Sequence, residues 1–147
     1  MKHIITAIFY LFIFQNWAQK KPWPKELITI PVKTNYQQTS TYTEVLSFIT
    51  ALQSSSNLLH LEYMATSKEG NKIPLVILAN PKVTSPKAAI DSGKPVLYIQ
   101  GNIHAGEVEG KEVVQQLMRD ILLGDKQHLL DNQIILFAPI YNTDSND

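Results

Sequence analysis

The chain has 147 residues, of which 44% are hydrophobic, and its 13 basic and 13 acidic side chains give a formal net charge of zero. This balance argues against a nucleic-acid-binding protein, which needs a basic surface. The sequence contains no cysteine, so disulfides and thiolate metal sites are excluded. Histidine and carboxylate side chains remain as the strong metal ligands.

The first residues have the pattern of a secretory leader. A short cationic start precedes the apolar segment from Ile4 to Phe14. This segment is shorter than the roughly 20 residues that span a bilayer and is typical of a signal-peptide core. We predict a signal peptide at residues 1–18, no stable membrane span, and export to the periplasm or the extracellular space. A buried N-terminal strand and an uncleaved anchor are the alternatives.

Residues 19–40 are polar and interrupted by prolines, which is typical of a linker or an extended N-terminal arm. Within them, the segment from Leu27 to Val32 is expected to be a short strand or extended chain. A domain is expected to occupy residues 41–147.

The domain is predicted to begin with a helix and a hairpin. Thr41 and Glu44 match a capping box, and apolar residues at helical spacing predict a helix from Thr43 to Gln53. The alternating segment Leu59 to Ser67 and the almost wholly apolar segment Ile73 to Ala79 predict two strands, the second covered on both faces. A turn at Gly70 would pair them as an antiparallel hairpin.

A strand–helix–strand unit follows. After a loop with a short helical turn at Lys87 to Ile90, the pattern predicts a buried strand from Pro95 to Gln100 and a helix from Gly110 to Leu123. A second buried strand is expected from Ile134 to Ala138. Such a unit joins two parallel strands.

One face of the second helix is expected to be polar and to carry Gln115, Gln116, Arg119 and Asp120. Glu109 and Glu112 are expected to be solvated helix residues. The opposite face is apolar, so the helix should pack on a sheet through that face.

These elements predict an α/β fold with a mixed, mostly parallel sheet flanked by helices. The polar segment from Pro139 to Asp147 follows a core strand and leaves that strand with little sequence to cover it. We therefore expect a fragment, or a truncated reading frame, of a larger α/β domain.

Chemistry is expected at His104 and Glu107, which lie where the first strand of this unit leads into its helix. Ligands bind in α/β proteins beyond the carboxyl ends of the strands. Residues three apart share one side of a helical turn, and imidazole and carboxylate are both good zinc ligands. The alternatives are a loop histidine that binds a backbone carbonyl and a first-turn glutamate that complements the helix dipole.

With these residues identified, the chain resembles the zinc carboxypeptidase family, the carboxypeptidase A/B-like metallopeptidases, from about Thr41 onward. The resemblance rests on the first helix, the hairpin, the segment from Gly101 to Glu112 and the segment from Pro139 to Asp144. It implies the N-terminal portion of a three-layer sandwich of helices around a sheet.

The resemblance implies a role for each matching residue. His104 and Glu107 match the first two zinc ligands, while the third ligand, the catalytic glutamate and the substrate-binding arginines of the family have no counterpart in this chain. Asn142 and Asp144 match an Asn-x-Asp-Gly stretch in which Ser145 replaces the glycine. They are expected either to form the loop or to contact substrate. No catalytic residue is therefore expected within the chain.

The implied function is that of a zinc-dependent metallocarboxypeptidase acting on a peptide or a small amide. In the complete domain, Zn²⁺ lowers the pKa of a bound water to about 7 and polarises the carbonyl next to a C-terminal residue. With two of the ligands, the chain alone is expected to bind zinc weakly and to be inactive. An acylase or amidase of the same fold acting on N-acyl amino acids, and a non-catalytic exported binding module, are the alternatives.

Overall fold

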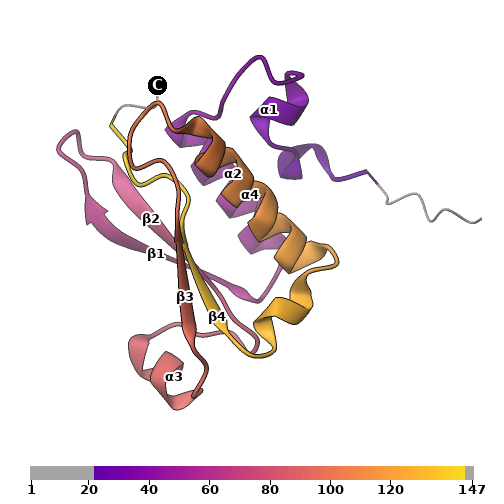
Figure 1. The fold of residues 1–147 in the computed structure, drawn as a ribbon, viewed down its shortest axis with the longest axis vertical. Helices are drawn as coiled ribbons and strands as arrows, with labels where there is room; N and C mark the ends of the chain where they lie inside the picture. The colour runs from indigo at the N-terminus through magenta and orange to yellow at the C-terminus, as the bar shows by residue number, and fades with distance from the viewer. Residues whose placement is uncertain (1–21, 145–147) are drawn as a thin grey trace, which may run out of the picture.

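The computed structural model describes residues 22–144, which form a four-stranded sheet with two long helices side by side on one face (Figure 1). The elements in chain order are η1 (Lys25–Leu27), α1 (Ile30–Lys33), α2 (Tyr42–Ser55), β1 (Leu59–Thr66), β2 (Lys72–Leu78), α3 (Pro86–Asp91), β3 (Val96–Gln100), α4 (Val108–Leu123), η2 (Gln127–Leu130) and β4 (Ile134–Ala138). The predicted signal peptide lies outside the described residues, and so does Ser145. The predictions made for both therefore stay predictions. Within the described part, no helix has the length and apolar character to cross a membrane.

The sheet is mixed, as predicted. Its strand order is β1-β2-β4-β3, with β1–β2 and β2–β4 antiparallel and β3–β4 parallel. The predicted hairpin and the parallel strand–helix–strand unit are both confirmed. Among the described strands the parallel pairing is confined to β3 and β4. These two strands therefore end at the same edge of the sheet, where the chain enters the loop before α4.

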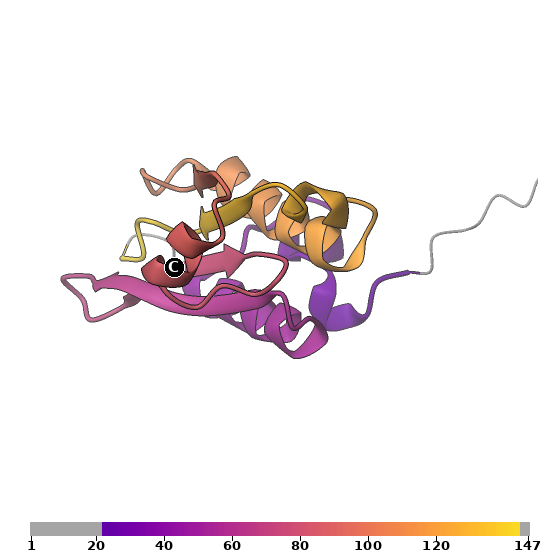
Figure 2. The ribbon, with the colours of Figure 1, turned by 90° about the horizontal axis from the view of Figure 1, so that it is seen from below.

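The main core lies between the sheet and the helix pair α2–α4. The capping box predicted for α2 is present: the Thr41 hydroxyl accepts the Glu44 N–H, and the Glu44 carboxylate accepts the Thr41 N–H at 2.9 Å. Figure 2 shows the two helices and the sheet from below. Apolar side chains of both helices pack against those of the sheet. The largest fully buried apolar side chains here are Phe137, Ile49, Leu52, Leu59, Leu78, Met118, Ile121, Leu130, Ile135 and Ile140.

The opposite face of the sheet is only partly covered. The short helix α3 packs Ala88 and Ala89 against Val83 and Ile134. An apolar groove of about 430 Å³ remains between α3, with the segment before it, and the four strands of the sheet. Helices thus lie on both faces of the sheet. Among the described residues, α3 is the helix on the second face.

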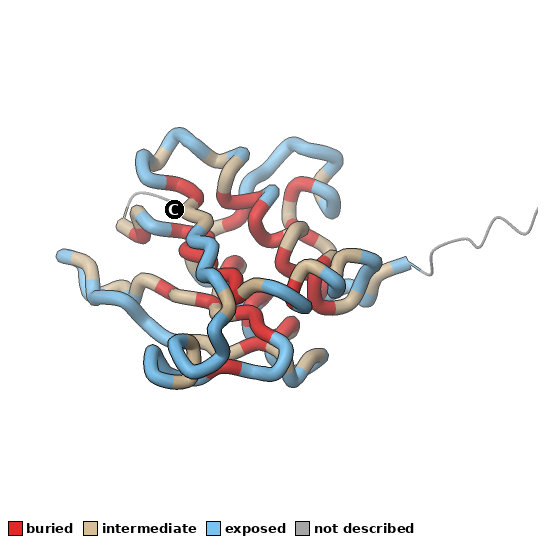
Figure 3. Tube along the Cα trace, turned by 60° about the horizontal axis from the view of Figure 1, so that its bottom comes forward, coloured by how far each residue is buried: buried red, intermediate tan, exposed pale blue. Residues whose placement is uncertain are grey.

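Strand β3 is not buried, contrary to the prediction from its apolar sequence. Val96, Leu97 and Tyr98 are 51%, 45% and 45% exposed, and the burial map in Figure 3 shows how the exposed segments surround the buried core. The reason is position, because β3 is the edge strand of the described sheet and borders the open groove. Strand β2 was predicted to be covered on both faces. It buries one face at Val76 and Leu78 and half-buries the other.

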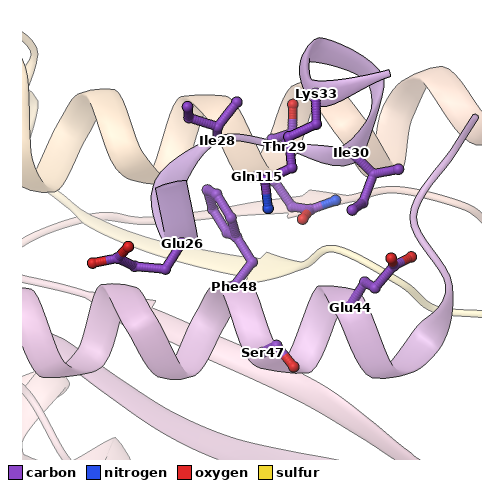
Figure 4. Close-up of a pocket in the computed structure, with 9 residues that line it drawn as sticks. All are labelled: Glu26, Ile28, Thr29, Ile30, Lys33, Glu44, Ser47, Phe48 and Gln115. Atoms are coloured by element: carbon purple, nitrogen blue, oxygen red, sulfur yellow. The ribbon is translucent and has the colours of Figure 1, made fainter. Parts of the chain in front are cut away.

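The N-terminal arm is helical and packed, so the prediction of an extended segment from Leu27 to Val32 was wrong. It forms η1 and α1, and Pro31 lies in the first turn of α1, where a missing N–H costs nothing. Leu27 joins the main core. Between the arm and α2 lies a pocket of about 190 Å³, toward which Phe48 points from α2 (Figure 4).

The arm also buries much of the polar face of α4, including Glu112, which was predicted to be solvated. Arg119 is 8% exposed, donates to the Leu27 carbonyl at 3.1 Å and places its guanidinium 4.7 Å from the centre of the Trp23 ring. Gln115 is 1% exposed and Glu112 is 6% exposed. The prediction failed because these polar side chains form hydrogen bonds with polar groups of the arm. They can therefore be buried without losing their hydrogen-bond partners. Glu109 is exposed, as predicted.

Candidate metal centre

The loop that carries the predicted metal ligands joins the end of β3 to the start of α4. It begins at Gly101, whose N–H donates to the Ala138 carbonyl at the end of β4 at 2.9 Å. A Cβ at Gly101 would lie 2.9 Å from the Gly110 carbonyl carbon in α4. Glycine therefore lets the loop pass close to the first turns of the helix, which brings the loop residues and the N-terminus of α4 together.

His104 and Glu107 face one another across this loop. The His104 Nδ1 atom lies 3.0 Å from Glu107 Oε1, and the His104 N–H donates to Glu107 Oε2 at 3.2 Å. The Glu107 N–H returns a bond to the His104 carbonyl at 3.0 Å. The expectation that the spacing brings the two side chains to one side is therefore met, and the histidine contacts a carboxylate rather than a backbone carbonyl.

The Glu107 carboxylate is ionised, and both side chains of the pair are open to solvent. Hydrogen bonds from the His104 imidazole and then from the His104 backbone N–H hold the pKa of Glu107 below its ordinary value. The side chains of His104 and Glu107 are 80% and 56% exposed. A carboxylate must be deprotonated to bind a metal, so both the charge and the access suit a cation.

The two donor groups fit part of a zinc site. Two ligands at about 2.1 Å from a tetrahedral zinc ion lie about 3.4 Å apart. The facing atoms of His104 and Glu107 are 3.0 Å apart, so a small outward movement of two exposed side chains would admit the ion. No group of three or more metal-binding side chains occurs within residues 22–144. A complete site would need at least one further ligand.

The segment after β4 closes the loop from the other side. The Tyr141 N–H donates to the Gly101 carbonyl at 3.2 Å, and the Asn142 N–H donates to the Asn102 carbonyl at 2.9 Å. The loop before α4 is therefore held by backbone bonds to two residues that follow the neighbouring strand. Because β3 and β4 are parallel, both segments emerge at the same edge.

Asp144 shapes this edge, in agreement with the loop-forming interpretation. Its carboxylate accepts the Ser67 hydroxyl, the Glu69 N–H at 3.2 Å and the Asn71 amide at 3.3 Å. These bonds, the one from Ser67 first, hold the pKa of Asp144 below its ordinary value. The carboxylate thus fixes the turn of the β1–β2 hairpin to the segment after β4.

Sequence reasoning missed Asn102, which lies between Gly101 and the ligand pair. Its φ is +57° and it is 2% exposed. Its amide donates to the His104 carbonyl at 3.2 Å and to the Ala105 carbonyl at 3.4 Å. The available signal was its residue type, because asparagine is the side chain other than glycine that most readily takes the left-handed conformation.

The structure is similar to solved structures of carboxypeptidases and of a thrombin-activatable fibrinolysis inhibitor. A carboxypeptidase A from Helicoverpa armigera matches with a TM-score of 0.64 at 19% identity, over 74% of this chain and 26% of that one. Bovine thrombin-activatable fibrinolysis inhibitor matches with a TM-score of 0.62 at 17% identity, over 77% and 34%. A metallo-carboxypeptidase from Burkholderia cenocepacia matches with a TM-score of 0.61 at 19% identity, over 74% and 28%. The chain therefore spans about a quarter to a third of each of these proteins.

The sequence comparisons give the family. No curated protein sequence matches the chain significantly. The family model described as "Zinc carboxypeptidase" matches residues 45–145, which is more than half of the chain and includes the ligand pair. Fold, motif and family match agree, and the chain belongs to the zinc carboxypeptidase family.

Proposed function

We propose that the chain provides part of a zinc-dependent metallocarboxypeptidase, in which His104 and Glu107 hold the zinc ion. The observation that carries the proposal is the 3.0 Å contact between His104 Nδ1 and Glu107 Oε1 at the N-terminus of α4, in a chain of this family. The reaction would be hydrolysis of the peptide bond next to a C-terminal residue. A bound zinc ion supplies Lewis acidity and a coordinated water with a pKa near about 7.

The residues of this chain would bind and orient the metal. Glu107 supplies an anionic oxygen at physiological pH, since its pKa is held low by His104. The N-terminal end of α4 adds a partial positive charge that favours the ionised carboxylate. The exposed position of both side chains leaves room for a substrate and for ligands from outside residues 22–144.

A zinc titration followed by NMR tests the proposal. The chain is expected to bind Zn²⁺ more weakly than micromolar, because two ligands hold a metal less tightly than three or four. Saturable shifts should appear at the His104 imidazole, and His104→Ala should abolish them. His128→Ala, at an exposed histidine remote in sequence, is the matched control and should leave the binding unchanged. Zinc shifts that persist in His104→Ala would refute the assignment.

A further inference from the structure

Asn102 occupies a conformation that needs an explanation. It combines a left-handed φ of +57° with 2% exposure, directly before the exposed ligand pair. A residue other than glycine in this region costs free energy, and such residues persist where the surroundings determine them. Strain of this kind points to a role for the side chain that occupies the position.

The side-chain amide of Asn102 binds backbone carbonyls of the loop between β3 and α4, which carries the ligand pair. It donates to the carbonyls of His104 and Ala105 at 3.2 and 3.4 Å. The His104 carbonyl also accepts the Glu107 N–H at 3.0 Å. One carbonyl oxygen thus links the Asn102 side chain to the backbone of both members of the ligand pair.

The backbone of Asn102 is itself fixed to the sheet. Its carbonyl accepts the Asn142 N–H at 2.9 Å, and the preceding Gly101 is bonded to Ala138 and Tyr141. Asn102 therefore lies at the rigid end of the loop, while its amide reaches the part that carries the ligands. This arrangement transfers the rigidity of the sheet edge to the loop.

We propose that Asn102 is a positioning residue that sets the relative placement of His104 and Glu107 by holding the carbonyls of the loop. The metal-binding part of this inference rests on the proposed function. The ligand side chains are 80% and 56% exposed, so surrounding packing constrains them little. Their placement then depends on the backbone from which they extend, and hydrogen bonds behind metal ligands commonly provide such orientation.

The substitution Asn102→Gly separates the side chain from the backbone. Glycine takes a φ of +57° without strain, so the variant keeps the loop conformation accessible and removes only the amide. Asn35→Gly is the matched control. Asn35 has a φ of +50°, is exposed, and lies in the N-terminal arm.

The first measurement needs no metal. The Glu107 N–H should exchange with solvent about tenfold faster in Asn102→Gly, a change of about 1.4 kcal/mol that matches the loss of the two weak hydrogen bonds from the amide. The Met118 N–H, in the middle of α4, is the reference for global stability and should keep its rate. An equal acceleration at Met118 and Glu107 would show a general loss of stability and would overturn the proposal, as would no acceleration at Glu107.

The second measurement is zinc affinity by the same NMR titration. Asn102→Gly should weaken binding about tenfold or more, the usual cost of removing a group that orients a ligand. Asn35→Gly should bind as the unaltered chain does. Equal affinity for the two variants would overturn the metal-binding part of the inference. An unaltered chain that binds no zinc at His104 would instead refute the proposed function, and the exchange measurement would still decide the role of Asn102.

Should Asn102→Gly fail to fold, Asn102→Asp provides the same test. Aspartate preserves the size of the side chain but has no N–H to donate to the two carbonyls. The Glu107 N–H should again exchange faster than in the unaltered chain. An unchanged rate would overturn the proposal.

Discussion

Glu107, at the N-cap of α4, and Glu112, five positions later in the helix, differ in their exposure to solvent. Glu107 is 56% exposed at its side chain and contacts one residue, His104, through both carboxylate oxygens. Glu112 is 6% exposed and accepts bonds from Thr39, Ser40 and Gln115. The first carboxylate is open to a cation from solvent, and the second is fully engaged by the protein.

The difference comes from the N-terminal arm. The backbone N–H and hydroxyl of Ser40 both bind Glu112, and the carbonyl of Ser40 accepts the ammonium of buried Lys111. Two neighbouring residues of α4, Lys111 and Glu112, thus provide hydrogen-bond partners for the backbone and the side chain of Ser40. The arm covers this part of the helix and leaves Glu107, at the N-cap, uncovered. Residue type alone therefore does not distinguish a candidate ligand from a structural carboxylate.

The largest effect on stability is expected from Glu112→Ala. Removing the carboxylate leaves the Ser40 N–H and the Ser40 hydroxyl buried without their acceptor, whereas the Gln115 amide still reaches the Ser40 hydroxyl and the Lys111 carbonyl. Each of these two groups costs about 1–3 kcal/mol, so the free energy of unfolding should fall by about 2–6 kcal/mol. Chemical denaturation measures this change.

Two further variants sharpen the interpretation of Glu112. Glu112→Gln keeps one acceptor oxygen and should lose less stability than Glu112→Ala. Glu109→Ala removes an exposed carboxylate from the same helix and should have little effect. A loss as large in Glu109→Ala would mean that helix electrostatics, rather than the contact with the arm, accounts for the result.

A smaller, pH-dependent effect is expected from Asp144→Asn. Asp144 resembles Glu112 in binding several donors and Glu107 in lying near solvent. Its pKa is lowered in the folded state, chiefly by Ser67, so its contribution to stability is present above the unfolded pKa of about 3.9 and is lost as the pH falls through the folded pKa. The unaltered chain should therefore be more stable than Asp144→Asn near pH 7, and the two should converge below about pH 4.

Denaturation of both chains between pH 3 and pH 7 measures this convergence. The hairpin turn should also exchange its amide protons faster in Asp144→Asn, because the bond from the Glu69 N–H is weakened. A stability difference that stays constant with pH would show that the charge of Asp144 contributes nothing to the link between the hairpin and the segment after β4.

The elements that were predicted correctly depend on local sequence. The capping box of α2, the turn at Gly70 and the apolar strand β4 are each specified by residues close together in the chain. The spacing of His104 and Glu107 is local as well, so the contact between them could be predicted. Three residues of separation at the start of a helix leave few alternatives for the two side chains.

The failures depend on distant contacts. The bond from the Ser40 N–H to Glu112 joins residues 72 positions apart, and nothing near Glu112 in the sequence indicates that it is buried. The exposure of β3 depends on its place at the edge of the sheet, whereas its sequence is that of a core strand. The role of Asn102 depends on the sign of φ, which its residue type permits but does not determine.

The smallest effect on stability and the largest on metal binding are expected together in Glu107→Gln. The carboxylate is exposed, so the contacts that lower its pKa are screened by solvent and contribute little to folding. Glutamine is nearly isosteric but neutral, and it is a poor zinc ligand compared with a carboxylate. Denaturation should therefore show a stability close to that of the unaltered chain, while the zinc-dependent NMR shifts at His104 should disappear. If Glu107→Gln instead lost as much stability as Glu112→Ala, both carboxylates would be structural. The contrast between the open and the engaged glutamate, and with it the case for a metal site at Glu107, would then fail.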